Sequence, residues 1–268
     1  MAKETQQING KCISVIIPCH NCAASLERTW QSLRGQTIGI DELECIFVDD
    51  ASADGGETWE LMNRIEQQAP DSIILIHLNV NLRQGGARNV GLTYATGRYV
   101  MFLDADDELF PHSCEVLYDK ACRDGADLIQ FNHRRTLGEE SRDNLQITHE
   151  ETIVIKSDAD RIPLLNASKV DYGCWNKFYS RQLILNAEAK FAEHAVYEEP
   201  LFTYPCFLYA DRVTLIPDVL YQYNLHVGSA VTSEIGRRLL DHPRVQLELL
   251  EYCAQRPELW IKYRAVIC

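Results

Sequence analysis

Apolar runs of strand length alternate with amphipathic helical spacing through the first half of the chain. The runs lie at 13–17, 43–48, 72–78 and 99–103, and polar residues follow each of them. Because nearly every position in these runs is apolar, they are typical of strands that are buried on both faces. A further run at 126–132 predicts another strand. The pattern therefore predicts an α/β fold in which a mostly parallel sheet is flanked by helices.

The second half of the chain has a more mixed pattern. Its polar and charged start predicts a surface hairpin or excursion, and short helices and strands follow. The last part has helical spacing and stops at Cys268 without a capping or breaker signal, which predicts that the natural chain continues. We expect five parts: a polar tail at 1–11, an α/β half at 12–132, an excursion at 133–156, a second half at 157–234 and a helical tail at 235–268.

Polar side chains follow the predicted strands at the point where each strand ends. In open α/β sheets, ligands bind in the crevice beyond the carboxyl ends of the strands. We therefore expect these residues to converge on one site: Pro18 to Asn21, Asp49 and Asp50, Asn79 to Arg83, and Asp104 to Asp107.

The most unusual of these groups is the acidic turn after the run at 99–103. Asp104, Asp106 and Asp107 lie within four positions, and carboxylates so close together repel one another. A D-x-D pair at a strand end can hold Mn²⁺ or Mg²⁺, which prefer oxygen ligands. Alternatively, Asp107 and Glu108 simply favour the N-terminus of the next helix. The residues of this turn alone leave both interpretations open.

Two other strand ends carry groups that suit a nucleotide. Asp50 can accept a hydrogen bond from a base N–H or a ribose hydroxyl, although Ser52 and Asp54 nearby also suit a turn that caps a helix. Arg88 follows a glycine pair early in a predicted helix, where it can bind a phosphate or pair with the aspartates. The glycine pair by itself also fits a tight turn.

Composition narrows the class of protein. The chain has 268 residues, 46% of them hydrophobic, and a formal net charge of −13, which opposes binding to nucleic acid or anionic lipid. Its longest apolar runs are strand-sized, so no signal peptide or spanning helix is predicted. Ten cysteines are scattered, and the single C-x-x-C, Cys19 and Cys22, is weak evidence for a redox or zinc site. Reduced thiols in a cytoplasmic protein are expected.

Several ordered blocks together resemble the family 2 glycosyltransferases, which are inverting enzymes with a GT-A fold. The resemblance spans roughly residues 12–232. Its blocks are SVIIPCHN, QTIGIDELECIFVDDASADGG, NLRQGGARNVGLTYATGRYVMFLDADDELFP, GCWNKFYSR, YEEPLF and YQYNLHVGSAVT. The order and spacing of these blocks make the resemblance more specific than any single motif. It implies a nucleotide-sugar-binding first half, a smaller acceptor-side region and C-terminal helices.

The resemblance assigns the strand-end residues to the nucleotide and its metal. Asp106 would be the direct metal ligand, and Asp104 would lie near the ribose or the waters on the metal. His20 departs from the tyrosine often found at its position, but an imidazole can still stack or donate. The nucleotide-binding set implied by the resemblance is Pro18, His20, Asn21, Asp50, Arg88, Asp104 and Ala105.

Inversion requires a general base that takes the proton of the acceptor hydroxyl. The family places an acidic pair, usually Glu-Asp, at the start of a helix, and Glu198 and Glu199 match it here. Glu199 replaces the usual aspartate and is the expected base, with Glu198 as the alternative. Without the resemblance, the same residues also fit a structural role, in which both acids favour a helix N-terminus that has Pro200 in its first turn.

The remaining matched blocks suggest acceptor or donor-lid contacts. Trp175 could stack on a sugar or pack in the core, and Lys177 could contact a phosphate or a substrate hydroxyl. His226 and Ser229 could close over the diphosphate. The alternation around Tyr221 predicts a strand.

The resemblance implies a metal-dependent hexosyl- or N-acetylhexosaminyltransferase. It would move a sugar from a nucleotide-diphosphate donor, a UDP-sugar by the family's tendency, to a glycan or lipid-linked acceptor in surface polysaccharide synthesis. The enzyme would work in the cytoplasm, with peripheral contact to the inner face of the membrane. The alternatives are a catalytically silent nucleotide-binding or scaffold protein and a sugar nucleotidyltransferase. Against the latter, PCHNCAAS lacks the Gly-rich, basic loop that a triphosphate needs.

Overall fold

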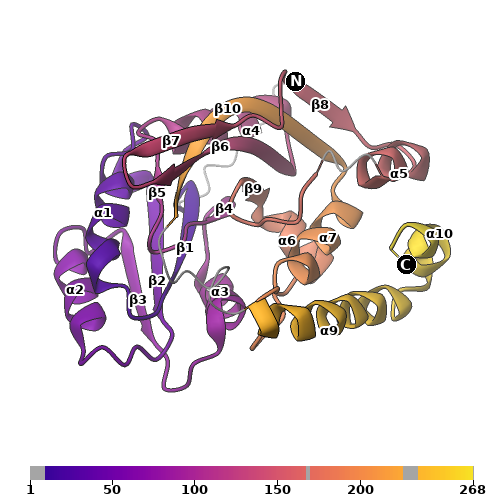
Figure 1. Ribbon diagram of the computed structural model, residues 1–268. Helices are drawn as coiled ribbons and strands as arrows, with labels where there is room; N and C mark the ends of the chain where they lie inside the picture. The colour runs from indigo at the N-terminus through magenta and orange to yellow at the C-terminus, as the bar shows by residue number, and fades with distance from the viewer. Residues whose placement is uncertain (1–9, 167–169, 226–234, 268) are drawn as a thin grey trace.

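A single curled sheet, with ten strands in the described part of the chain, organises the protein. The computed structural model describes residues 10–166, 170–225 and 235–267 (Figure 1). The main path of the sheet runs β3-β2-β1-β4-β9-β6-β10-β5, with β7 paired to β6 and β8 paired to β10. Helices flank this sheet, and the two C-terminal helices pack against other helices.

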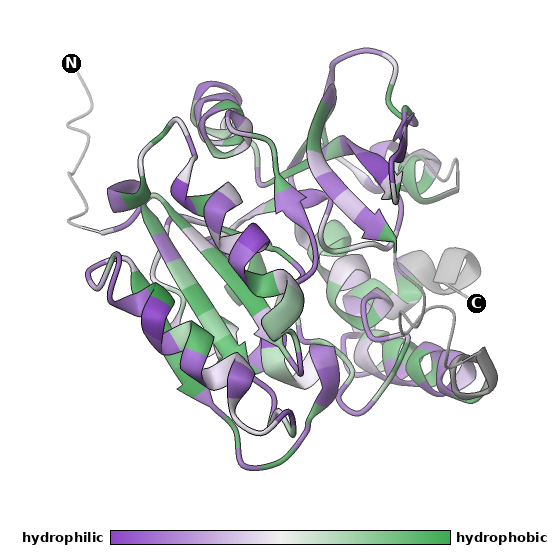
Figure 2. Ribbon diagram, turned by 60° about the vertical axis from the view of Figure 1, so that its left-hand side comes forward, coloured by the Kyte–Doolittle hydropathy of each residue, from purple (hydrophilic) through white to green (hydrophobic). Residues whose placement is uncertain are grey.

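The first half of the sheet is parallel, as the apolar runs predict. It consists of β1 (Ile13–Cys19), β2 (Leu43–Asp49), β3 (Ile73–His77) and β4 (Tyr99–Phe102). All three pairings among these strands are parallel. Figure 2 shows that these strands are mostly hydrophobic, while the helices beside them carry many hydrophilic residues. Their polar ends therefore meet at one edge, where the sequence predicts a site.

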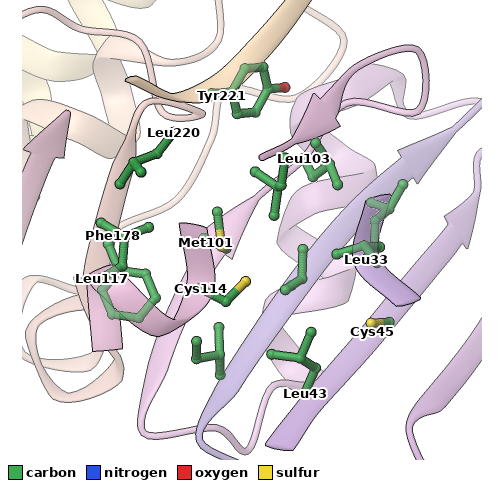
Figure 3. Packing of buried hydrophobic residues seen from close by; sticks show 14 of the residues in the cluster. Leu33, Leu43, Cys45, Met101, Leu103, Cys114, Leu117, Phe178, Leu220 and Tyr221 are labelled. Carbon is green, nitrogen blue, oxygen red and sulfur yellow. The ribbon is translucent and has the colours of Figure 1, made fainter. Parts of the chain in front are cut away.

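Two hydrophobic clusters cover the two faces of this parallel part. On one face, Val15 and Ile17 of β1 pack with α1 (Ala23–Arg34), α2 (Glu57–Glu66) and α4 (Ser113–Asp124). Figure 3 shows the interior of this cluster, including Met101 of β4 and Cys114 of α4. On the other face, Ile16 packs with α3 (Arg83–Tyr94), α6 (Arg181–Ala187) and α7 (Pro200–Tyr209). Alternate residues of one strand thus serve two cores.

The second half of the sheet is mostly antiparallel, with β6 and β10 as its parallel pair. Its strands are β5 (Glu108–Leu109), β6 (Leu128–Leu137), β7 (Glu140–Asn144), β8 (Glu151–Val154), β9 (Lys177–Ser180) and β10 (Arg212–Leu225). The excursion expected at 133–156 is therefore attached to the sheet, because β6 extends into it and both β7 and β8 pair with long strands. A short 3-10 helix (Ile40–Glu42) precedes β2.

Two apolar segments at 213–216 and 219–223 each have the pattern of a short strand, but in the structure they form the single strand β10. It is one strand with register shifts between Ile216 and Val219 and between Val219 and Tyr221. Pro217 lies at the first irregularity, where its missing N–H does not interrupt the pairing. The irregularity joins both predicted segments into a strand long enough to reach the acidic turn.

The remaining helices of the described residues are α5 (Asp158–Asn166), α9 (Ile235–Ala254) and α10 (Pro257–Ile267). Helix α9 lies beside α7, and Cys253 of α9 packs with Leu208 of α7 and Leu259 of α10. Within the described ranges, no helix combines the length and apolar character needed to cross a membrane.

Candidate active site

The loops after β1 and β2 are locked together at the carboxyl edge of the sheet. His20 Nδ1 lies 2.9 Å from the carbonyl oxygen of Asp50. The Asn21 side chain accepts a hydrogen bond from the N–H of Ala53 (2.7 Å), and the Asn21 N–H donates to Ser52 (2.9 Å). Asn21 and Ala51 have φ angles of 51° and 54°, a region that non-glycine residues seldom adopt and that often marks functional loops. The sequence-predicted His20, Asn21 and Asp50 are thus neighbours.

The two aspartates at the end of β2 have different partners. Asp50 Oδ1 accepts a hydrogen bond from the N–H of Leu82 at 2.6 Å, and burial raises the pKa of Asp50. Asp49 is buried, and its Oδ2 lies 2.7 Å from His77 Nδ1. Sequence reasoning missed this Asp49–His77 pair. The register of β2 and β3 sets the two residues side by side. The histidine at the end of β3 was the feature of the sequence that could have predicted this pair.

Two members of the predicted nucleotide set are buried. Pro18 is enclosed within β1, and Ala105 is covered in the acidic turn. The Ala105 carbonyl accepts hydrogen bonds from Ser25 (2.9 Å) and Thr29 (3.0 Å) of α1. These contacts fix the backbone of the turn against α1, so the position of the neighbouring aspartates is well defined.

Arg88 connects the acidic turn to the acidic pair. Its side chain is buried on α3, and its Nη2 donates to Asp104 Oδ1 at 2.6 Å while its Nη1 donates to Glu198 Oε1 at 2.5 Å. A Cβ added at Gly85 would lie 2.4 Å from the carbonyl oxygen of Ala192, so this glycine permits the close approach of the loop that carries Glu198. Sequence reasoning predicted a partner among the aspartates and missed Glu198.

The aspartates of the acidic turn are held by β10. Tyr221 donates its hydroxyl to Asp107 Oδ2 at 2.7 Å and accepts the Asp104 N–H at 3.2 Å. The N–H of Asn224 donates to Asp107 Oδ1 at 2.7 Å. Burial, with the charges of Asp104 and Asp106, raises the pKa of Asp107 well above its usual range. Tyr221 lies in a strand as predicted, but its role beside the aspartates was not foreseen.

The alternative role for these acids, at a helix N-terminus, is wrong. Helix α4 begins at Ser113, and Glu108 lies in β5 instead, where its Oε1 is 3.0 Å from Arg28 Nε. Contacts with α1 and β10 therefore hold the acidic turn in place, and the N-terminus of α4 does not.

The chemistry of the turn fits a hard divalent cation that is held jointly with a substrate. Among the residues that the structure describes, no group of three or more His, Cys, Asp and Glu side chains is arranged to hold a metal ion. Asp104 and Asp106 are half-buried, and both oxygens of the neighbouring Asp107 are engaged by β10. Mn²⁺ and Mg²⁺ often bind through one or two carboxylates, with water and phosphate oxygens completing the ligand set.

The two glutamates before α7 have different environments. Glu198 is buried against Arg88, whereas Glu199 Oε1 accepts a hydrogen bond from the N–H of Cys174 at 2.8 Å. Burial and the charge of Glu198 raise the pKa of Glu199 to about 7, and Arg88 opposes the shift. A carboxyl group with this pKa exchanges a proton readily near neutral pH.

Lys177 fixes the segment that contacts Glu199. It is fully buried, and its Nζ donates to Asp171 (2.6 Å), to the Gly173 carbonyl (2.5 Å) and to the Asn176 side chain (2.9 Å). A lysine has three N–H donors, so this arrangement leaves none for the phosphate or substrate hydroxyl expected from the sequence. Lys177 instead shapes the turn that presents the Cys174 N–H.

Trp175 belongs to an aromatic group beside the acidic turn. Its ring stacks on Tyr223, with centroids 5.5 Å apart and an interplanar angle of 9°, and meets His133 edge-on at 4.6 Å. Burial lowers the pKa of His133 to about 4, so that ring is neutral at physiological pH. Trp175 is half-buried, which suits both its packing and the sugar contact predicted for it. The predicted lid residues, His226 and Ser229, lie outside the described residues.

Comparisons with known proteins show the family of this chain. The family described as Glycosyl transferase family 2 matches residues 14–185. The uncharacterized glycosyltransferase YibD of Escherichia coli K12 is 29% identical over 217 residues, which are 80% of this chain and 61% of YibD. The chain thus spans about three fifths of the length of that relative.

Two solved structures share the fold. Staphylococcus aureus TarS 1-349 in complex with UDP-GlcNAc has a TM-score of 0.73 at 20% identity and matches 95% of this chain and 73% of its own. By sequence, TarS is a poly(ribitol-phosphate) beta-N-acetylglucosaminyltransferase that is 27% identical over 231 residues, 82% of this chain and 37% of TarS. The mannosyltransferase PcManGT of Pyrobaculum calidifontis, with GDP-Man and Mn²⁺, has a TM-score of 0.63 at 18% identity over 91% of this chain and 65% of its own. The common fold is GT-A, as expected.

Proposed function

This chain belongs to glycosyl transferase family 2 and is a glycosyltransferase, and from that premise we propose the reaction that its site performs. It transfers a sugar from a UDP-sugar to a hydroxyl group of a glycan or lipid-linked acceptor, with inversion at the anomeric carbon. The reaction depends on a divalent metal and serves surface polysaccharide synthesis. It takes place in the cytoplasm, at or near the inner face of the membrane.

One observation carries this proposal: Arg88 holds Asp104 of the acidic turn and Glu198 of the acidic pair on the same guanidinium group. The group that would bind the donor and the group that would activate the acceptor are thereby fixed relative to each other. Such fixed geometry lowers the barrier of a reaction between two bound molecules.

The donor side is assigned to the strand ends. His20, Asn21 and Asp50 would surround the base and ribose, because their loops are locked together at the edge of β1 and β2. Asp106 and Asp104 would hold Mn²⁺ or Mg²⁺. The bound cation would supply positive charge that stabilises the diphosphate leaving group.

The acceptor side is assigned to Glu199. Its carboxylate takes the proton of the acceptor hydroxyl as the oxygen attacks the anomeric carbon from the face opposite the departing diphosphate. The pKa of about 7 makes Glu199 basic enough to accept that proton while leaving it largely ionised above neutral pH. Glu198 keeps its ion pair with Arg88 and holds the pair of acids in position.

The choice of donor rests on the relatives. TarS binds UDP and UDP-GlcNAc in its solved structures, and its name describes transfer of N-acetylglucosamine to a polymer. These properties support UDP as the nucleotide, a hexose or N-acetylhexosamine as the sugar, and a surface polymer as the product. The mannosyltransferase bound to Mn²⁺ supports the metal.

Calorimetric titration of UDP, GDP and dTDP, first with Mn²⁺ and then with EDTA, tests the donor side. We expect UDP to bind in the presence of the metal and to bind much more weakly after chelation. The variant Asp106→Ala should lose this metal dependence together with turnover. No binding of any nucleotide under either condition would instead favour a catalytically silent protein.

A second measurement tests the base. Glu199→Gln should abolish sugar transfer while leaving nucleotide binding nearly unchanged, because the carboxamide keeps the shape of the side chain and cannot accept the proton. Wild-type turnover in this variant would reassign the base to Glu198.

A further inference from the structure

Three aromatic rings form a row on the surface beside the acidic pair. Tyr172 is 39% exposed, and its ring meets that of Tyr197 with centroids 5.2 Å apart and an interplanar angle of 66°. Tyr197 in turn stacks on the exposed ring of His242, at 4.5 Å and 24°. The row joins three segments that are far apart in the sequence: the turn before β9, the loop before α7 and the first half of α9.

The backbone beneath the row is fixed by hydrogen bonds. The buried Thr203 of α7 donates its hydroxyl to the carbonyl oxygen of Tyr172 at 2.9 Å. The N–H of Val196 donates to Asp241 Oδ2 of α9 at 2.9 Å, which fixes the residue before Tyr197. The backbone that carries Tyr172 and Tyr197 is therefore fixed before any ligand arrives, which reduces the entropy lost on binding.

The row begins next to the proposed general base. The N–H of Cys174 donates to Glu199, and Tyr172 lies two positions before Cys174. Tyr197 precedes Glu199 itself by two positions. The row and the carboxylate that activates the acceptor are therefore carried by the same two segments.

We propose that Tyr172, Tyr197 and His242 form a subsite for a pyranose ring of the acceptor, so that the acceptor is a saccharide. This inference rests on the proposed function and names the acceptor class. A pyranose carries an apolar C–H face that stacks on aromatic rings, while its hydroxyl groups remain in water. Asp241 and Arg244 beside the row are paired with each other at 3.6 Å, so the surface suits a neutral sugar better than a phosphate.

Saturation-transfer NMR on the UDP-loaded protein tests the subsite without requiring turnover. The probes are methyl β-D-glucopyranoside and methyl N-acetyl-β-D-glucosaminide, with ribitol as an acyclic polyol that has no pyranose face. We expect both glycosides to bind and ribitol not to bind. Tyr172→Ala should weaken glycoside binding about tenfold, because a ring contact of this kind contributes about one tenfold step in affinity. Tyr172→Phe keeps the ring and should retain binding.

Tyr94→Ala is the matched control, since it removes a tyrosine that is 49% exposed at the far end of α3. It should leave glycoside binding unchanged. Unaltered UDP affinity and melting temperature in Tyr172→Ala show that the variant is folded, and His242→Ala provides a second, independent test. Equal glycoside binding by wild type and Tyr172→Ala, or no glycoside binding by the wild type, would overturn the subsite. Failure of UDP binding would instead count against the proposed function.

Discussion

On the nucleotide side of the site, Asn21, Asp50 and His77 find their partners about one strand–helix unit away in the sequence. On the acceptor side, Glu198 finds its partner Arg88 at a separation of 110 residues. The first arrangement follows from the parallel sheet, because neighbouring strands end at the same edge. The second depends on contacts between distant segments, among which the buried ion pair of Arg88 and Glu198 is central. We therefore expect the acceptor side to be far easier to disrupt by substitution.

The largest expected effect is that of Arg88→Met. The substitution leaves Asp104 and Glu198 without their shared cation, and removing one partner of a buried ion pair costs about 3–5 kcal/mol. Denaturant unfolding should show this loss in the free energy of unfolding, together with loss of transfer. Arg123→Met is the control, because that side chain is 67% exposed and should change stability by less than about 0.5 kcal/mol.

A double variant sharpens the same comparison. Glu198→Gln removes a charge that Arg88→Met would leave unpaired, so the combined change should cost less than the sum of the two single changes. Strict additivity would show that the two residues do not stabilise each other, and it would remove the link between the two sides of the site.

The next largest effect is expected within the acidic turn. Asp106→Asn should lower metal-dependent turnover about 100-fold or more, because it weakens charge stabilisation at the leaving group. The neighbouring Asp107→Asn should reduce turnover far less, since Asp107 is occupied by Tyr221 and Asn224. Steady-state rates at saturating Mn²⁺ distinguish the two. Comparable losses in both variants would show that the turn acts through its shape alone.

The same contrast explains what the sequence could and could not predict. Continuously apolar strands followed by polar residues predicted the parallel half and the edge where His20, Asp50 and the acidic turn lie. The contact between Arg88 and Glu198 was not predictable in this way, because no local pattern records which helix approaches a distant loop. The burial of Lys177 against Asp171 was hidden for a different reason: the two residues are close in the sequence, but lysine is usually exposed.

A smaller effect, about tenfold per pH unit, is expected in the pH dependence. Glu199 must be ionised to accept a proton, so kcat/KM should rise with pH up to about 7 and level off above that value. The raised pKa also means that the Glu199 carboxyl stays protonated to a higher pH in the folded protein than in the unfolded protein. Stability should therefore fall as pH rises from the ordinary range of a glutamate to about 7, and Glu199→Gln should remove that decline.

Glu198→Gln offers a check on the cause of this shift. The charge of Glu198 raises the pKa of Glu199, whereas Arg88 lowers it. Removing the Glu198 charge should move the acidic limb of the pH–rate profile to lower pH. An unchanged midpoint would mean that another group is responsible for the limb.

The smallest expected effect is that of Tyr221→Phe, which tests how β10 supports the acidic turn. The lost hydroxyl donates to Asp107 and accepts the Asp104 N–H, so the variant leaves a buried donor and a buried acceptor without their partner. Such a loss costs about 1–2 kcal/mol, and a looser turn should also weaken Mn²⁺-dependent UDP binding a few-fold. Tyr94→Phe, at an exposed position, should change neither quantity. Reduced stability with unchanged UDP binding would mean that the hydroxyl supports the fold but does not position the aspartates for the metal.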